Sequence, residues 1–168
     1  MQALDRLLGR VLTVMAALAG VIMVATMAGI VFQATARTLG YSGSSHVFTF
    51  TEYGLLFMTL LAAPLLVRLK GHVYIEIVTA AVPDPVRIVL SRLVAVISML
   101  TCLVLAWYAG EVTHLNFIRD QYDMRSLDMP RYLLIGPMVI CFALMAIEFG
   151  RFVFGREVMH TGRAGVHE

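Results

Sequence analysis

Residues 11–36 read VLTVMAALAGVIMVATMAGIVFQATA, and none of these 26 residues carries a formal charge. At about 1.5 Å per residue they form about 39 Å of helix, which exceeds the hydrocarbon core of a bilayer at about 30 Å. Basic residues precede the stretch, as they do in a secretory signal peptide, but the apolar part of such a signal is only about 7–15 residues long. The stretch therefore predicts a membrane-spanning helix that is retained.

Three further neutral runs follow along the chain, at residues 53–67, 93–110 and 132–147. The first of these is too short to cross a bilayer alone, so we expect its helix to begin near Phe48 and to carry Glu52 at the interface. We expect the last helix to continue through Phe154, which places Glu148 and Arg151 one turn apart near its end. The pattern predicts an all-α membrane protein with four transmembrane helices.

The composition agrees with this fold class. Hydrophobic residues make up 60% of the 168 residues and charged residues 14%, whereas an average soluble domain is roughly 45–50% apolar and 25% charged. The net charge is only +2, and the basic residues are scattered rather than gathered into a stripe. We therefore expect no nucleic-acid partner.

The positions of lysine and arginine predict the orientation, because cytoplasmic connections of membrane proteins are enriched in them. With both termini in the cytoplasm, nine of these residues lie on the cytoplasmic side and four on the other. The nine are Arg6, Arg10, Arg68, Lys70, Arg87, Arg92, Arg151, Arg156 and Arg163. The four are Arg37, Arg119, Arg125 and Arg131. Both termini are therefore predicted to be cytoplasmic.

The connection between the second and third helices contains a short segment, residues 72–82, that mixes apolar and polar residues and is too short to span. We expect it to lie along the inner membrane interface, in contact with lipids. Asp84 followed by Pro85 is typical of a helix start, so the third helix should begin there. Residues 1–154 form one four-helix transmembrane domain in this interpretation, and residues 155–168 form a polar, mobile cytoplasmic tail.

The residues give little support to catalysis. Cys102 and Cys141 lie inside hydrophobic runs, where a cysteine usually packs as a small apolar residue. There is no CxxC pair and no glycine-rich phosphate loop. We therefore predict no enzyme activity, no metal site and no bound cofactor.

A membrane anchor of a respiratory complex is the first alternative, because such anchors often hold a haem between histidines of facing helices. None of the five histidines falls in the middle of a predicted span; they are His46, His72, His114, His160 and His167. Glu111 and His114 have the spacing of half a di-iron site, but such a site needs two copies and further carboxylates. An independent small transporter is the second alternative. It would need ionisable groups near mid-membrane, which the spans lack.

Small residues follow one ridge of the first predicted helix, at Ala17, Val21, Ala25 and Gly29. Such residues let another helix approach closely. We expect Ala17, Ala25 and Gly29 to form a helix-packing surface, whose partner is either another helix of this chain or a helix of another subunit.

Four features along the chain resemble one family. They are Arg37 closing the first span, Glu52 opening the second, the stretch RLKGHVYIE at residues 68–76 followed by Pro83, and LDMP at residues 127–130. Their order resembles the small membrane subunit, or dicarboxylate-type small permease, of tripartite ATP-independent periplasmic (TRAP) transporters. Many members have two acidic residues where this chain has Thr51 and Glu52.

The resemblance implies partners rather than a catalyst. In that family a large membrane subunit of the bacterial inner membrane moves the substrate together with sodium ions, and a periplasmic substrate-binding protein delivers the substrate. The small subunit would brace the large one and help to dock the binding protein during uptake of a small organic anion. The substrate itself would be set by the two partners.

Three hypotheses follow for particular residues. Arg37 and Glu52 flank the first outer loop and could pair if their helices are neighbours; otherwise each reaches water separately. His72 and Glu76, four residues apart, could contact the large subunit or a lipid headgroup, or could form a solvated interfacial face.

The third hypothesis concerns the second outer loop. Asp120, Asp123 and Arg125 could help to seat the periplasmic binding protein, because contacts of this kind are plausibly electrostatic. The alternative is an ordinary solvated loop.

Overall fold

The computed structural model describes residues 2–41, 45–69, 84–123 and 128–154. These ranges include all four neutral runs and the predicted start of the third helix at Asp84. The proposed interfacial segment with His72 and Glu76, the loop position Arg125 and the C-terminal tail lie outside the described residues.

Four helices dominate the structure: α1 (Gln2–Thr38), α2 (Ser45–Arg68), α4 (Asp84–Ile118) and α5 (Arg131–Phe154). Each is long and apolar enough to cross a membrane, which confirms the predicted fold class. Helix α4 begins at Asp84, where the Asp-Pro signal predicted a helix start. Two short antiparallel strands, β1 (Tyr122–Asp123) and β2 (Met129–Pro130), connect α4 to α5 and were not predicted.

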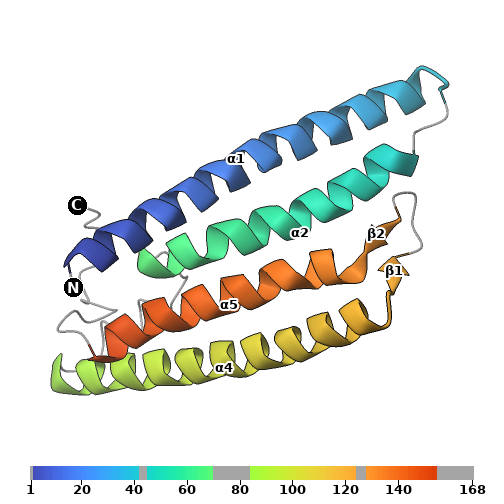
Figure 1. Ribbon diagram of the computed structural model, residues 1–168. Coiled ribbons are helices and arrows are strands. Elements are labelled where there is room, and N and C mark those ends of the chain that lie inside the picture. Colours follow the sequence, from blue (N-terminus) through green and yellow to red (C-terminus); the bar gives the residue numbers. More distant parts are fainter. Residues whose placement is uncertain (1, 42–44, 70–83, 124–127, 155–168) are drawn as a thin grey trace.

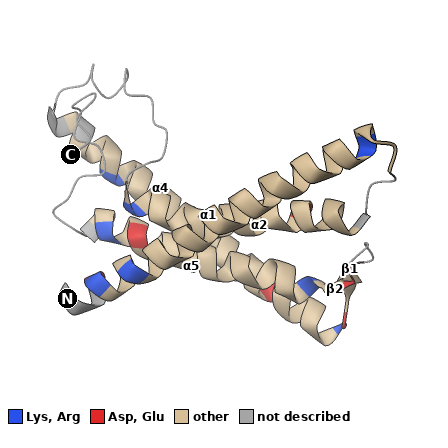
Figure 2. Cartoon of the chain, turned by 90° about the horizontal axis from the view of Figure 1, so that it is seen from above, with Lys and Arg blue, Asp and Glu red and all other residues tan. Residues whose placement is uncertain are grey.

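The helices lie side by side in a row rather than in a closed bundle. Helix α1 packs on α2, α2 packs on α5, and α5 packs on α4, so the spatial order is α1, α2, α5, α4 (Figure 1). The two outer helices have 37 and 35 residues, whereas the two inner ones have 24 each. Seen from above, α1 and α4 cross, and most charged residues lie toward the ends of the helices (Figure 2).

The first α-helical hairpin, α1 and α2, is held by a seven-residue pattern. Leu12, Ala19 and Thr26 are buried at intervals of seven, as in the seam of a left-handed helix pair. The helices lie close together at Thr26, whose hydroxyl oxygen would clash with a β-carbon added at Gly54. A glycine at this position therefore lets the two helices cross closely.

An apolar core joins α2, α4 and α5 in the half of the row where α2 and α5 end. Its buried residues are Val67, Ala95, Cys102, Ala146, Phe149 and Phe152. Cys102 and Cys141 are both buried and unbridged, as expected for cysteines that pack as apolar residues.

Most of the predicted packing ridge of α1 lies on the face of the helix that no other described helix covers. Ala17 and Ala25 are exposed, and a β-carbon added at the neighbouring Gly20 would meet nothing within 4 Å. Gly29 is the exception, because a β-carbon there would lie 3.7 Å from Val47 of α2. The ridge therefore packs within the chain only at Gly29, and its other small residues remain uncovered.

Candidate functional site

Four charged residues from three helices meet at one end of the row. Asp5 comes from the first turns of α1, Arg68 is the last residue of α2, and Glu148 and Arg151 lie near the end of α5. The N-terminal end of α1 thus lies beside the C-terminal ends of α2 and α5 (Figure 1). We call these four residues the charged cluster.

The contacts of the charged cluster form a closed ring of ion pairs. Glu148 Oε1 accepts a hydrogen bond from Arg68 Nη1 at 3.2 Å, and Glu148 Oε2 accepts one from Arg151 Nη1 at 3.0 Å. Asp5 Oδ1 lies 2.9 Å from Arg68 Nη2 and 2.8 Å from Arg151 Nη1. Two carboxylates therefore balance two guanidinium groups.

Burial within the charged cluster is uneven. The Glu148 side chain is only 1% exposed, whereas Asp5 and Arg151 are 46% and 41% exposed. A buried carboxylate strongly destabilises a folded protein when it has no partner of opposite charge. The two arginines therefore compensate the buried charge of Glu148. The more exposed contacts of Asp5 contribute less, because water screens them.

The sequence predicted only two of the four residues of the charged cluster to be neighbours. It placed Glu148 and Arg151 one turn apart, and the structure confirms this pair, but it did not join them to Arg68 or Asp5. Part of the signal was present in the sequence, because Arg68 and Glu148 directly follow neutral runs. The order of the helices in the row was still needed to bring them together.

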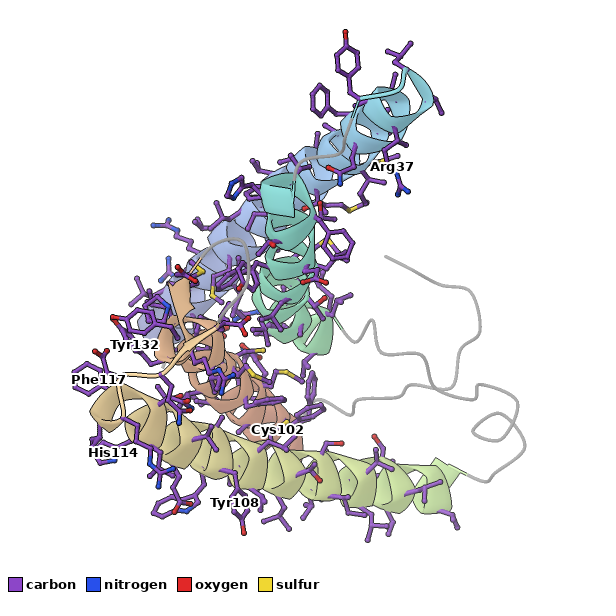
Figure 3. The ribbon with its side chains drawn as sticks, turned by 90° about the vertical axis from the view of Figure 1, so that its right-hand side faces the viewer. Arg37, Cys102, Tyr108, His114, Phe117 and Tyr132 are labelled. Atoms are coloured by element: carbon purple, nitrogen blue, oxygen red, sulfur yellow. The ribbon has the colours of Figure 1, made fainter. Side chains whose placement is uncertain are left out.

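A polar link joins the helices at the opposite end of the row. The Tyr53 hydroxyl of α2 donates a hydrogen bond to Asp123 Oδ2 of β1 at 3.0 Å. The N–H of Arg131, at the start of α5, donates to the Gln121 carbonyl at 3.0 Å. Beside them, the rings of Phe117 and Tyr132 meet edge to face with centroids 5.4 Å apart (Figure 3).

The predicted docking residues lie in different surroundings. Asp120 is exposed and has a positive φ of 48°, a conformation that aspartate tolerates better than most residues. Its charge raises the pKa of the exposed Tyr122 phenol, because a nearby carboxylate disfavours the phenolate. Asp123 is half-buried and accepts the bond from Tyr53.

Arg37 and Glu52 are on neighbouring helices, as their pairing requires, but the helix register separates them. Gly29 of α1 faces Val47 and Thr51 of α2, so Glu52 lies near the height of Gly29. Arg37 follows eight residues later, about 12 Å further along the axis, and is exposed near the C-terminal end of α1 (Figure 3). The structure does not bring these two side chains together, and their pairing stays a prediction.

The described residues contain no group of three or more His, Cys, Asp or Glu that could hold a metal ion.

His114 is exposed on α4, as are Trp107 and Tyr108 at 76% and 61% (Figure 3). Exposed tryptophan and tyrosine on a spanning helix are typical of the membrane interface.

Four apolar helices with ionic contacts at their ends define a multi-pass membrane protein. The family described as Tripartite ATP-independent periplasmic transporters, DctQ component, matches residues 26–158. The chain therefore belongs to this family of TRAP transporter components, which are inner-membrane proteins. A comparison with curated proteins finds no match. The family match confirms the resemblance drawn from Arg37, Glu52 and the two loop motifs.

Proposed function

We propose that the chain is the non-catalytic small subunit of a TRAP-type uptake system and braces the large subunit that moves substrate and sodium ions. The family match carries this proposal. The row architecture supports it, because the ionic contacts of the charged cluster join helix ends. The end with the charged cluster is cytoplasmic in this proposal, and the β1–β2 connection is periplasmic.

The large subunit packs on the outer face of α1 in this proposal. Ala17 and Ala25 are exposed there and permit close helix approach. The α1 face also exposes larger side chains such as Val21, at 65%, between these alanines, whereas the outer face of α4 exposes Leu100 and Val104 by 54% and 53%. Large apolar side chains beside Trp107 suit contact with lipid.

Co-purification tests the proposed function. The chain is tagged after Glu168, extracted gently from native membranes, and its partners are identified by mass spectrometry. We expect a stoichiometric partner with many spans and transporter-like broken helices. A haem protein or flavoprotein would instead make the chain a respiratory anchor, and recovery of the chain alone would contradict the proposal.

A bulky residue on the α1 face should separate the two subunits. Ala25→Trp is expected to lower the recovered large subunit about tenfold, because the indole prevents close packing of small residues. Val104→Trp on the outer face of α4 is the matched control and should leave recovery unchanged. Equal recovery with both variants would place the large subunit elsewhere.

Arg37, Glu52, His72 and Glu76 remain proposed contacts with the large subunit or with lipid headgroups. Arg37 is the most accessible of those described, since it lies near the exposed outer end of α1. Reversing the charge of Arg37 should impair assembly, and a variant without any effect would remove this residue from the proposal.

The outer surface around Asp120 helps to seat the periplasmic binding protein in this proposal. Asp120 lies among exposed apolar side chains, with Phe117 and Ile118 each 65% exposed and Tyr122 47% exposed. Apolar area with a charged rim is typical of a transient protein interface. The cargo is a small organic anion whose identity the two partners determine.

Charge reversal tests this docking surface. Asp120→Lys should change the association rate of the binding protein about threefold to tenfold at low salt, because rim charges act mainly on association. The effect should vanish near 1 M salt, where charges are screened within about 3 Å. Glu111→Lys, an exposed carboxylate nine residues earlier on α4, serves as the control. Equal rates for Asp120→Lys and the unmodified complex at low salt would exclude this role.

A further inference from the structure

The row is made of two α-helical hairpins, α1–α2 and α4–α5, which meet along α2 and α5. Within each hairpin the helices are adjacent in sequence and pack over much of their length. Between the hairpins the helix contact is narrower, and polar links occur at both of its ends. The role that these links would have in transport rests on the proposed bracing function. Their effect on the arrangement of the two hairpins does not.

The inner link is the charged cluster. Glu148 and Arg151 belong to the second hairpin, and their partners Arg68 and Asp5 belong to the first. Glu148 is the central member, because it is almost fully buried and binds guanidinium groups from both hairpins. A buried charge of this kind holds its partners in place, since releasing them would leave the carboxylate uncompensated.

The outer link is the hydrogen bond from Tyr53 of the first hairpin to Asp123 of the second. Asp123 is itself held, because β1 pairs with β2 directly before α5 begins. The hydrogen bond from Arg131 to Gln121 closes the same connection. A movement of Tyr53 relative to Asp123 would therefore have to break this hydrogen bond or shift the paired strands.

The spacing of the two links determines what they do. Tyr53 and Arg68 are 15 residues apart on α2, about 22 Å along the helix axis. One link would let the hairpins pivot about it, whereas two links at opposite ends of one helix resist rotation as well as separation. The apolar core around Val67 lies near the inner link, so the outer half depends more on the Tyr53 bond.

We propose that Glu148 and Asp123 are positioning residues that fix the angle between the two hairpins at the two membrane surfaces. The small subunit then presents a rigid row to the large subunit during transport. Asp123 holds the two hairpins together within the chain. Asp120 and its apolar neighbours contact the binding protein instead.

Distances between spin labels test the proposal on the full chain in lipid nanodiscs. Cys102→Ala and Cys141→Ala provide the background. The inner pair of labels replaces Leu7 and Leu93, and the outer pair replaces Val31 and Leu115; all four side chains are exposed, by 61%, 54%, 58% and 42%. Each pair joins α1 to α4 and therefore reports the angle between the hairpins.

Each link should control its own end of the row. Tyr53→Phe removes one hydroxyl and is expected to widen the outer distance distribution about twofold, with little change at the inner pair. Glu148→Gln is expected to widen the inner distribution by a similar factor, and the double variant should widen both. Tyr108→Phe and Glu111→Gln are matched controls on exposed positions of α4.

The outcomes separate this proposal from general instability and from the proposed function. Unchanged widths in the folded single variants would overturn it, and so would equal widening at both ends in every variant. Co-purification of the large subunit is measured separately. If the large subunit is not recovered, the transporter role is contradicted, but the proposal that the two links fix the angle between the hairpins is not. If both the proposed function and the fixed angle between the hairpins are correct, the complex with the double variant should retain the large subunit and should transport its substrate several-fold more slowly.

Discussion

Gly54→Ala should destabilise the chain, and Thr26→Ala should restore it. A β-carbon at Gly54 clashes with the Thr26 hydroxyl oxygen, and the Thr26 side chain is buried between the two helices. Overpacking of this kind costs about 1–3 kcal/mol. Removing the hydroxyl leaves the Thr26 β-carbon 3.6 Å from the added carbon, an ordinary contact.

The buried cysteines provide the measurement for Gly54→Ala. A thiol-reactive dye labels Cys102 and Cys141 when the helices separate, because both thiols are buried in the folded chain. Gly20→Ala, at a position with open space, is the control. It should leave the midpoint of the unfolding transition, followed by thiol labelling, unchanged or slightly higher. Thr26→Ala alone should be neutral or stabilising, since its buried hydroxyl has no hydrogen-bond partner among the described residues. A double variant as unstable as Gly54→Ala would contradict this account of the crossing.

Glu148→Ala should destabilise the chain, because it removes the buried member of the charged cluster that both arginines contact. It leaves Arg68 and Arg151 with only Asp5 between them. Removing one partner of a buried ion pair costs about 3–5 kcal/mol. Arg68 is 21% exposed and reaches water in part, so the lower end of that range is expected.

Helicity followed during a denaturing-detergent titration measures this loss. Glu111→Ala removes an exposed carboxylate and should change stability by less than about 0.5 kcal/mol. Glu148→Met combined with Arg68→Met should cost less than the sum of the two single changes, because neither charge is then left alone. Strict additivity would show that Arg68 and Glu148 do not interact in the folded chain.

The four helices could be predicted from sequence because the bilayer imposes a local rule. A spanning segment must be apolar over about 20 residues, and that condition is visible in a single run such as residues 11–36. The start of α4 was equally visible, because Asp84 and Pro85 act within one turn.

The packing faces were harder to predict, because lipid and protein both accept apolar side chains. Helix α1 is apolar on all sides, so the ridge with Ala17 and Ala25 and the face with Leu12 and Ala19 were equally reasonable. The structure buries the second face. Gly54 was missed for the same reason, since its role depends on the residue opposite it on another helix.

The charged cluster and the outer link depend on residues far apart in sequence. Asp5 and Glu148 are more than 140 residues apart, and no local pattern indicates that α1 begins beside the end of α5. The two-residue strands that hold Asp123 are too short to give an alternating pattern.

An open row of helices has two free edges, as an open β-sheet has edge strands. Here α1 and α4 each have one flank packed within the chain and one flank uncovered. A neighbouring subunit can add helices at the α1 edge without displacing any helix already in place. In the proposed complex, folding and assembly can then be separate steps, so the chain can reach its final shape in the membrane before the large subunit binds.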